Sequence, residues 1–467
     1  MASSDNRRSF LKKSTAALVG LSIEARRNLL ANPKPRVGIV GGGLAGVSSA
    51  WLLDGVADTF LFENRPSLGG HTHTIPVEVE NQVLLVDVGA QFVAPGPHPT
   101  YFKLLEVLGL LTPEDPDHDL TIEAELSITS TEEGQPLPRF VSPTTSRRWP
   151  IRARWNTAGL LAFLAFSQAA KELCQEGDYL LPLDDWLRSL PIREEEREQL
   201  ILPLLAAMVG APVEQTRRLS ARSAVIFVAC ALPENPLDPF LYSNSLIGLG
   251  GNTERLSEDT GTLTTYLNAP LIRVRPLPDG RYRLRNRAGI FADVDIVIFA
   301  SPPYVTGRLL GEIPQLAGAA RILQQFEYFK TEISIHRDPI YMPQNPLFWS
   351  AYNPHLIDGH SEASVWLGVL RPVPPGQAPI RLFKSWATAR PAPPQEEVFR
   401  RAFLHPLITP DFIQTQRELE AFQGTAGIWF AGSYTKEVDS QETALLSAVR
   451  VVEELFPDAP NLLRLQT

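Results

Sequence analysis

The first strong hydrophobic pattern in the chain is a short apolar run that ends in glycines and leads directly into a helical pattern. The run Val37 to Val40 is followed by Gly-Gly-Gly-Leu-Ala-Gly. The alanine- and leucine-rich stretch from Val47 to Leu53 predicts a helix, and a second apolar run, Thr59 to Phe62, ends in Glu63. Strand, glycine turn, helix, strand and acid, in this order, are typical of a dinucleotide-binding unit.

The three glycines of this turn, Gly41, Gly43 and Gly46, have the spacing G-x-G-x-x-G. We expect Gly41 to permit a tight turn, Gly43 to let a pyrophosphate approach the backbone, and Gly46 to let the helix pack close to the strand. The start of the helix would point N–H groups at the phosphates, and Glu63 would accept hydrogen bonds from ribose hydroxyls. Neighbouring residues predicted to line the same site are Leu44, Ala45, Asn64 and Arg65.

A second glycine pair follows the acid, in the stretch Gly69-Gly70-His71-Thr72-His73-Thr74. A pair this close to Glu63 indicates another approach of the backbone to a phosphate. The alternating stretch Val83 to Val88 predicts a strand, which runs into Asp87-Val88-Gly89-Ala90-Gln91-Phe92.

In this order the motifs resemble those of the FAD-dependent amine oxidase superfamily, which includes phytoene desaturase-like enzymes. Residues 69–74 are most similar to a bacterial subgroup of FAD-binding oxidoreductases, some of which resemble enzymes acting on fatty acyl chains. Amine oxidases usually carry arginine where this chain has Ser67 and His71, which weakens the amine-oxidase reading but not the FAD reading. The resemblance implies cofactor contacts at Gly69, Gly70, His71, Thr72, Gly89, Ala90, Gln91 and Phe92.

Between Pro95 and about Leu219 the hydrophobic pattern becomes helical. We expect a mostly helical insertion that carries the substrate cavity. Its most apolar part, Trp155 to Ala170, is shorter than the about 20 residues of a spanning helix. It indicates either a buried helix or a peripheral membrane contact. The expected helical stretches are Tyr101 to Leu111, Trp155 to Glu176, Leu183 to Leu190, and Glu194 to Val209.

The chain then returns to the pattern of the first domain. A helix is expected to be capped near Asn252 and to run through Leu256, and strands are expected at Pro270 to Val274, Tyr282 to Leu284 and Val294 to Ala300. The resemblance implies that the backbone of Leu271 holds the adenine. It also implies that Ala300 and Pro302 line the cofactor.

A further strand is expected within Gln325 to Met342. In amine oxidases a lysine on a comparable strand holds a water against the flavin, so the resemblance makes Lys330 a catalytic candidate. The alternative is an exposed lysine on a half-buried strand. The proline-rich stretch Arg371 to Pro394 predicts a surface connection.

Near the C-terminus, Gly427 to Ser433 predicts a buried strand that ends in glycine, and Gln441 to Glu454 predicts a helix. The start of that helix again offers N–H groups to a negative centre. The resemblance implies that it faces the flavin pyrimidine ring, although Thr443-Ala444 stands where Gly-Ala is usual. The residues implied here are Gly432, Ser433, Glu442, Thr443 and Ala444.

Composition limits the partners. The chain has 467 residues, 44% hydrophobic residues and a net charge of -9, which favours two domains and argues against nucleic acid as a partner. No metal site is predicted. Where the family links flavin covalently it uses a C-terminal cysteine, and no cysteine follows Cys230. We therefore expect non-covalent FAD.

The first 34 residues differ from the rest of the chain. Asn6 to Lys12 resembles a twin-arginine export signal, and Ser14 to Ile23 would be its weak apolar region. The charged stretch Glu24 to Arg27 stands where a small-residue cleavage site is expected. The predicted location is periplasmic, with a cytoplasmic protein as the alternative.

The predicted fold class is α/β, with a Rossmann-like FAD-binding domain of the amine oxidase and glutathione reductase type and an interleaved α+β substrate domain. The first function hypothesis is an FAD-dependent oxidoreductase that takes hydride from, desaturates or isomerises an apolar substrate such as a fatty acyl or polyene chain. The alternatives are an amine or amino-acid oxidase that uses O2, and a non-enzymatic flavin-binding partner. The expected boundaries are 1–34 for the extension, 35–95, 240–310 and 415–460 for the FAD-binding domain, and 96–239 and 311–414 for the substrate domain.

Overall fold

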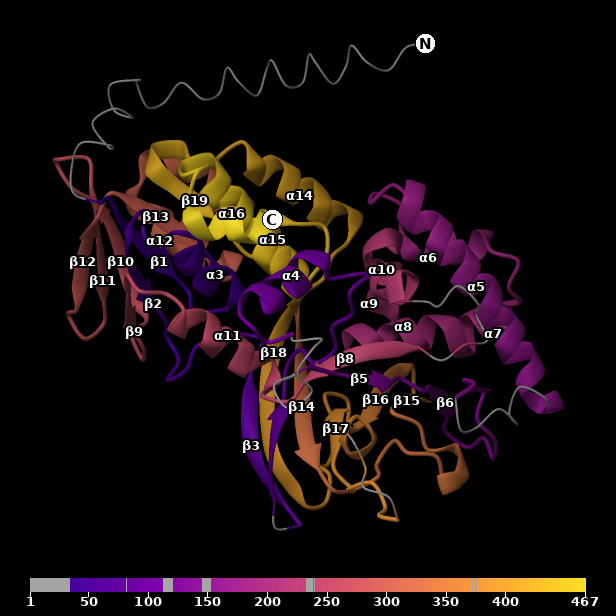
Figure 1. The fold of residues 1–467 in the computed structure, drawn as a ribbon. Helices are drawn as coiled ribbons and strands as arrows, with labels where there is room; N and C mark the ends of the chain where they lie inside the picture. Colours follow the sequence, from indigo (N-terminus) through magenta and orange to yellow (C-terminus); the bar gives the residue numbers. More distant parts are fainter. Residues whose placement is uncertain are drawn as a thin grey trace.

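The computed structural model describes residues 34–467 except 81, 112–120, 145–152, 232–237, 239, 372 and 374–375. The twin-arginine-like stretch lies outside the described residues. Figure 1 shows two sheets, one covered by helices from both ends of the chain and one beside a helical layer from its middle.

The first sheet is parallel and has five strands. The first strand, residues 36–40, pairs on one side with residues 58–62 and on the other with residues 296–299. Segments far apart in the sequence therefore lie side by side. This arrangement confirms the predicted α/β class with a Rossmann-like sheet. The strand order is β19 (Ile428–Phe430), β13 (Ile296–Phe299), β1 (Arg36–Val40), β2 (Asp58–Phe62) and β9 (Leu263–Tyr266).

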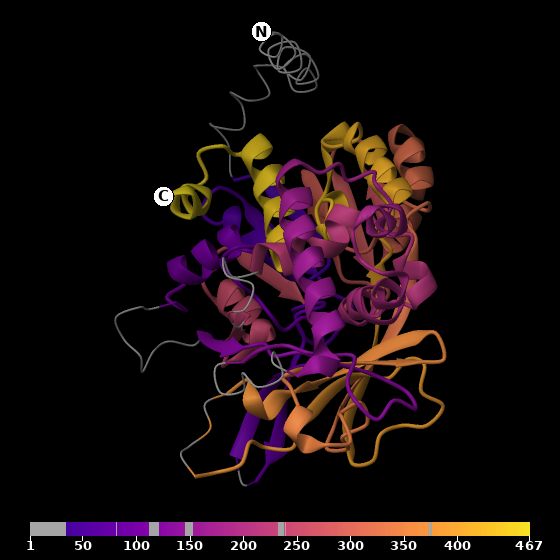
Figure 2. The same cartoon turned by 90° about the vertical axis from the view of Figure 1, so that its right-hand side faces the viewer.

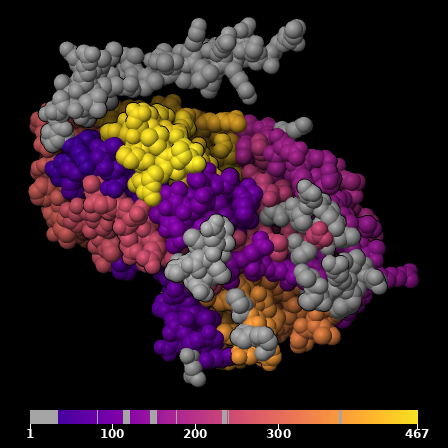
Figure 3. Space-filling view, in the orientation of Figure 1, coloured from indigo at the N-terminus to yellow at the C-terminus, as the bar shows by residue number. Residues whose placement is uncertain are grey.

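The helix after the glycine turn, α3 (Leu44–Leu52), packs against the C-terminal helix α15 (Gln441–Leu455). Val47 and Trp51 of α3 and Leu445 of α15 are fully buried in one hydrophobic core. Figure 3 shows the C-terminal segment (yellow) directly against the segment near residue 100 (violet). Other helices of this layer are α4 (Pro99–Val107), α11 (Gly248–Glu258) and α16 (Pro460–Gln466).

The predicted helix start at Asn252 is wrong, because α11 begins at Gly248. Asn252 is instead buried inside the helix, where its Nδ2 donates to the Tyr101 hydroxyl at 3.1 Å and its Oδ1 accepts from Ser245. The sheet's other side carries a three-stranded antiparallel sheet and three helices. These are β10 (Leu271–Pro276), β11 (Tyr282–Asn286), β12 (Phe291–Val294), α12 (Pro303–Leu309), α13 (Ala317–Ile322) and α14 (Pro410–Glu420).

The second large sheet has seven strands, and one of them corrects the sequence analysis. β17 lies within the stretch predicted as a surface connection, yet it pairs with β14 and β16 in the sheet interior. The hydrophobic pattern did not predict this short strand, because prolines flank it on both sides and two of its residues, Lys384 and Ser385, are polar. The strand order is β18 (Glu397–Pro406), β14 (Tyr328–His336), β17 (Phe383–Trp386), β16 (His360–Trp366), β15 (Tyr352–Ile357), β6 (Thr129–Glu132) and β7 (Phe140–Val141).

A helical layer from the middle of the chain covers this sheet (Figure 2). The expected helix over 194–209 is interrupted by a π-helical turn at Arg197–Ile201. One side of α5 is buried at Phe163 and Phe166, whereas Leu161 is 61% exposed. Across the described ranges, no helix is both long and apolar enough to span a membrane. The layer contains α5 (Thr157–Glu176), α6 (Leu183–Ser189), α7 (Glu194–Glu196), α8 (Leu202–Val209), α9 (Val213–Thr216) and α10 (Ala221–Ala231).

Two antiparallel strand pairs connect the two halves of the molecule. The hairpin of β3 (Thr74–Val79) and β4 (Gln82–Asp87) carries the chain from the second glycine pair to the Asp87–Phe92 segment. The strands β5 (Thr121–Glu125) and β8 (Leu241–Ser245) pair nearby, and Val93 bridges to Ser243 of β8.

Two buried histidines, His98 and His336, should reduce stability in mild acid. Burial lowers the pKa of each to about 4 from an ordinary value of 6.5. Between pH 6.5 and 4 the unfolded chain therefore binds protons that the folded chain does not. The free energy of unfolding should fall as the pH falls through this window, by about 3 kcal/mol per histidine, and this contribution should be constant above it.

Thermal unfolding measured from pH 8 to pH 4 tests this expectation. A His336→Gln variant should show a smaller loss of Tm in acid, and a substitution of the exposed His360 should leave the loss unchanged. An acid loss of the same size in the His336→Gln protein would contradict it.

Candidate functional site

Close backbone packing holds the glycine turn between β1 and α3. Gly41 has a φ of +108°, and a side chain there would meet the Ala300 carbonyl oxygen at 2.6 Å. A side chain on Gly46 would lie 2.0 Å from the carbonyl oxygen of Gly41. A side chain on Gly43 would meet only one backbone atom, at 3.9 Å. Gly41 and Gly46 are therefore required by packing, and Gly43 leaves open space.

The second glycine pair, Gly69-Gly70, lies against the glycine turn, and we call the two stretches together the cradle. Gly69 bridges to Gly43 and donates its N–H to the carbonyl oxygen of Gly42 at 2.8 Å. A side chain on Gly70 would lie 3.1 Å from the Cα of Gly43. No side chain caps α3, whose first turn starts at Leu44-Ala45 and contains no acid. The N–H groups at the start of α3 can donate to a pyrophosphate, and the glycines of both stretches leave room for it to approach the backbone.

The carboxylate of Glu63 ties this cradle together. It is buried and accepts hydrogen bonds from the N–H groups of Gly42 at 2.7 Å and Arg65 at 2.8 Å. The guanidinium of Arg65 donates to the Gly70 carbonyl oxygen at 3.1 Å. Each Glu63 oxygen keeps a further lone pair, which can accept from a ribose hydroxyl. Asn64 is exposed beside it.

The middle of the chain adds two edges to the cradle. The N–H of Ala269 donates to the Glu63 carbonyl oxygen at 2.8 Å, so β10 begins, at Leu271, next to the acid. The N–H of Ala300 donates to the Val40 carbonyl oxygen at 2.9 Å, and Pro302 then leads into α12.

The segment Gly89–Phe92 lies directly against His71. A side chain on Gly89 would be 1.9 Å from the His71 carbonyl oxygen, and the N–H of Ala90 donates to that oxygen at 3.0 Å. The Thr72 hydroxyl donates to the carbonyl oxygen of Gly69 at 2.7 Å. The structure thus joins two of the segments that the sequence predicted to share one site. Phe92 packs edge-on against Tyr242.

Lys384 of β17 is a site residue that sequence analysis missed. Its side chain is buried, and Nζ donates to the Gly89 carbonyl oxygen at 2.5 Å and to Gln91 Oε1 at 3.2 Å. Burial lowers the pKa of Lys384 to about 8, against the attraction of the Asp87 carboxylate. Burial also raises the pKa of Asp87 to about 6, although a hydrogen bond from Thr74 and the charge of Lys384 oppose the shift.

A histidine pair lies beside the same segment. The rings of His71 and His405 stack with centroids 5.0 Å apart and an interplanar angle of 12°. His405 Nδ1 is 3.7 Å from Asp439 Oδ2, and the Ser433 hydroxyl donates to Asp439 Oδ1 at 2.5 Å. Burial lowers the pKa of His71 to about 4, and the charge of His405 adds to the shift. The buried His71 ring is therefore favoured in its neutral form.

The C-terminal residues take part mainly through hydrogen bonds within the protein. The Glu442 carboxylate accepts from the N–H groups of Thr100 and Tyr101 and so caps α4. Thr443 forms a capping box with Ser440 at the start of α15, next to Ala444. Gly432 has a φ of +135°.

The structure does not bring Lys330 to these segments. On β14 it points to the face opposite that of its buried neighbours Phe329 and Thr331. Its side chain is 59% exposed, and Nζ pairs with Glu332 at 2.6 Å. A catalytic role for Lys330 stays a prediction.

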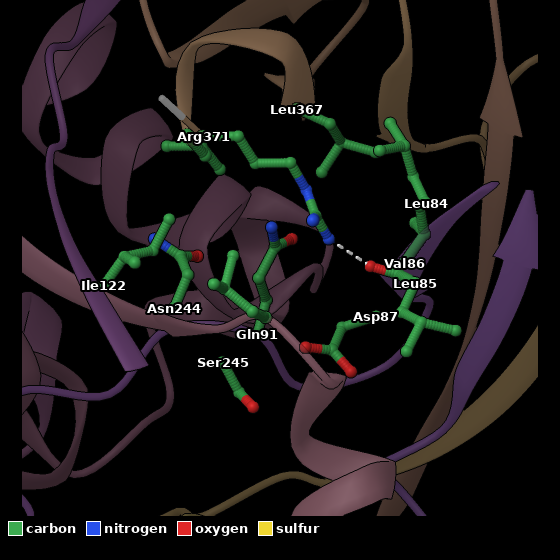
Figure 4. Close-up of a pocket in the computed structure, with 12 residues that line it drawn as sticks. Leu84, Leu85, Val86, Asp87, Gln91, Ile122, Asn244, Ser245, Leu367 and Arg371 are labelled. Carbon is green, nitrogen blue, oxygen red and sulfur yellow. Dashed lines mark hydrogen bonds between the residues drawn. The ribbon is translucent and has the colours of Figure 1, made fainter. Parts of the chain in front are cut away.

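Figure 4 shows a pocket whose lining includes Asp87 and Gln91 of the predicted cofactor segment. Its cavity volume is about 20 Å³, enough for roughly one water molecule. Its walls come from β4, β5, β8 and the segment 367–371. The other lining residues are Leu84, Leu85, Val86, Ile122, Asn244, Ser245, Leu246, Leu367, Leu370 and Arg371.

If FAD is bound without a covalent link, denaturation should release all of the flavin from the polypeptide. Cys174 and Cys230 are the cysteines of the chain, and the hydrogen bond between them raises the pKa of the Cys174 thiol. After unfolding and ultrafiltration, yellow colour should pass the filter completely. Colour retained with the polypeptide would contradict the expectation.

Comparison with known proteins identifies a family for most of the chain. The family model described as flavin-containing amine oxidoreductase matches residues 44–331. A comparison with curated protein sequences gives no match.

Solved structures show the same fold at low sequence identity. A fatty acid isomerase from P. acnes that produces CLA is 12% identical, covers 90% of this chain and 99% of its own, and superposes with a TM-score of 0.62. Cyclohexylamine oxidase from Brevibacterium oxydans IH-35A is 15% identical, with 91% and 100% coverage and a TM-score of 0.61. A putrescine oxidase is 17% identical, with 91% and 99% coverage and a TM-score of 0.59.

Proposed function

Because the chain belongs to the flavin-containing amine oxidoreductase family, we propose that this FAD-dependent enzyme takes hydride from, desaturates or isomerises a fatty acyl or polyene chain. One observation carries the proposal. The pocket beside Asp87 and Gln91 is walled mainly by leucine, isoleucine and valine. The cavity is too small for the substrate itself, but aliphatic side chains beside the predicted cofactor segment favour a hydrocarbon neighbour over water.

We expect the cradle to hold FAD. The glycine turn, the second glycine pair and Glu63 would hold the dinucleotide part of the cofactor. His71 directly follows the second glycine pair, and the Gly89–Phe92 segment lies against it. Bound FAD would supply hydride acceptance. The His405–Asp439 pair, stacked on His71, would accept or return a proton during the reaction.

An anaerobic assay tests the proposal. The purified yellow protein is mixed with oleate, a polyene, putrescine or cyclohexylamine, and flavin absorbance is followed. Products are analysed as well, because an isomerisation leaves the flavin oxidised at its end. We expect oleate or the polyene to be converted. Bleaching by the amines alone, with peroxide formed in air, would contradict the proposal and favour the amine-oxidase alternative, for which Lys330→Met is the next variant to measure.

A further inference from the structure

The three-stranded sheet of β10, β11 and β12 has one buried face and one face in solvent. Its strands alternate between buried and exposed residues, and Val274, Leu284 and Val294 are buried in one hydrophobic core. A side chain on Gly38 of β1 would meet Leu284 and Val294, so the buried face packs directly on β1. In Figure 1 this sheet forms one end of the molecule, and helices α5 and α6 lie at the other end.

The solvent face carries four exposed arginines in two directly opposed pairs, and we call these four residues the arginine face. Arg273 on β10 lies opposite Arg285 on β11, and Arg275 lies opposite Arg283. Opposed residues of antiparallel strands point to the same face with Cβ atoms about 5 Å apart, and like charges placed there destabilise the sheet. This arrangement therefore requires negative charge to balance it.

The protein provides carboxylates for only two members of the arginine face. Arg273 Nε lies 2.5 Å from Glu312 Oε1, and Arg283 Nε lies 2.6 Å from Asp293 Oδ1. The other two arginines form no ion pair with any residue that the structure describes, and neither does Arg287 in the turn after β11. Each guanidinium without a carboxylate keeps its donors for an external anion.

The positive charge of this sheet contrasts with the rest of the molecule. Residues 271–295 contain six arginines and three aspartates, whereas the whole chain has a net charge of -9. A local positive area on an acidic protein orients the molecule as it approaches a negatively charged surface. The sheet is therefore the end of the molecule that such a surface would attract.

Apolar side chains beside the arginines indicate which kind of anionic surface fits. Phe291 of β12 lies opposite Arg285 and is 55% exposed, and Arg283 Cζ lies 4.7 Å over its ring. Ile272, where the register of β10 shifts, is 51% exposed, and Ile290 is exposed next to Phe291. Nucleic acid would match the arginines but would leave the isoleucines in water. The headgroup region of a bilayer accepts both arginine and hydrocarbon.

We propose that the arginine face, together with Phe291, Ile272 and Ile290, binds the surface of a membrane that contains anionic phospholipids. The lipid phosphates would provide the negative charge that Arg275 and Arg285 lack within the protein. The inference goes beyond the proposed function and does not depend on it, because the contact lies on an outer face of the sheet and needs no turnover.

Vesicle flotation with the FAD-loaded, full-length protein tests the inference. Vesicles of phosphatidylcholine alone are compared with vesicles that also contain roughly 30% phosphatidylglycerol, at salt concentrations of about 50 mM and about 500 mM. The protein should float with the anionic vesicles at low salt, bind them more weakly at high salt, and bind little to phosphatidylcholine alone.

The variant Arg275→Gln/Arg285→Gln should bind anionic vesicles roughly 30-fold more weakly, because each arginine near such a surface contributes about fivefold in affinity. Phe291→Ser should weaken binding several-fold at either salt concentration, because an apolar contact is not screened. Arg188→Gln/Arg218→Gln is the matched control. It removes the same charge from two exposed arginines outside this sheet and should bind as the unaltered protein does.

Flavin content and Tm report whether each variant is folded, and both should stay unchanged because the altered side chains are exposed. A further variant, Arg275→Lys/Arg285→Lys, keeps the charge and should retain most of the vesicle binding. Equal binding by the arginine-face variant and the control, or binding that does not depend on phosphatidylglycerol, would overturn the inference. Tighter binding of single-stranded RNA or polyglutamate than of anionic vesicles would also overturn it, since the face would then serve another class of partner.

Discussion

The Gly46→Ala variant is expected to bind FAD roughly 100-fold more weakly and to lose about 3 kcal/mol of stability. The added Cβ would stand 2.0 Å from the Gly41 carbonyl oxygen, so α3 must move away from the turn that holds the phosphates. Alanine normally favours a helix over glycine by about 1 kcal/mol, so a net loss can come only from this contact. Flavin content after gel filtration and the midpoint of urea unfolding measure both effects.

Gly311→Ala is the matched control. A Cβ at Gly311 meets nothing within 4 Å, and its backbone does not need a positive φ. This variant should keep its FAD and its stability. A Gly46→Ala protein that is as yellow and as stable as the Gly311→Ala protein would show that the turn has been placed wrongly.

Lys384→Met should destabilise the folded protein by about 3 kcal/mol. It removes the ammonium that donates to the carbonyl oxygen of Gly89 and to Gln91. It also removes the cation whose charge acts most strongly on the buried Asp87 carboxylate. Leaving a buried acceptor without its charged donor costs about 1 to 3 kcal/mol, which is more than an exposed ion pair contributes. Lys330→Met, which removes an exposed lysine, should change stability by less than about 1 kcal/mol.

A double variant separates charge from packing. Asp87→Asn keeps an oxygen that can accept from Thr74 and from the N–H of Leu249, but it carries no charge. Added to Lys384→Met, it should restore part of the lost stability in urea unfolding. Losses that simply add in the double variant would mean that Lys384 and Asp87 do not interact.

The glycine turn was predictable because local backbone geometry requires its residues. Gly41 has a positive φ, and Gly46 has no room for a Cβ, so sequence spacing alone carries the information. The parallel sheet followed from the same motif. The terminal helix was predictable for a similar reason, because its apolar residues repeat with helical spacing and are buried at Leu445 and Val452.

Lys384, His405 and Asp439 could not be found in this way. Each lies in a different segment and acquires its partners only when β17, β18 and the start of α15 are brought to Gly89 and His71. A lysine in a short proline-flanked stretch reads as exposed. A lysine on a strand can be assigned to a catalytic site only when the face of the strand that carries it is known. Lys330 shows this, because its buried neighbours lie on the opposite face of the strand.

The order of strands in the parallel sheet has a consequence for biosynthesis. β1 is made first, but its neighbour β13 and the next strand, β19, leave the ribosome about 260 and 390 residues later. Helix α3 likewise stays without its cover until α15 has been translated. We therefore expect stable binding of FAD only after β13, β19 and α15 have all been translated.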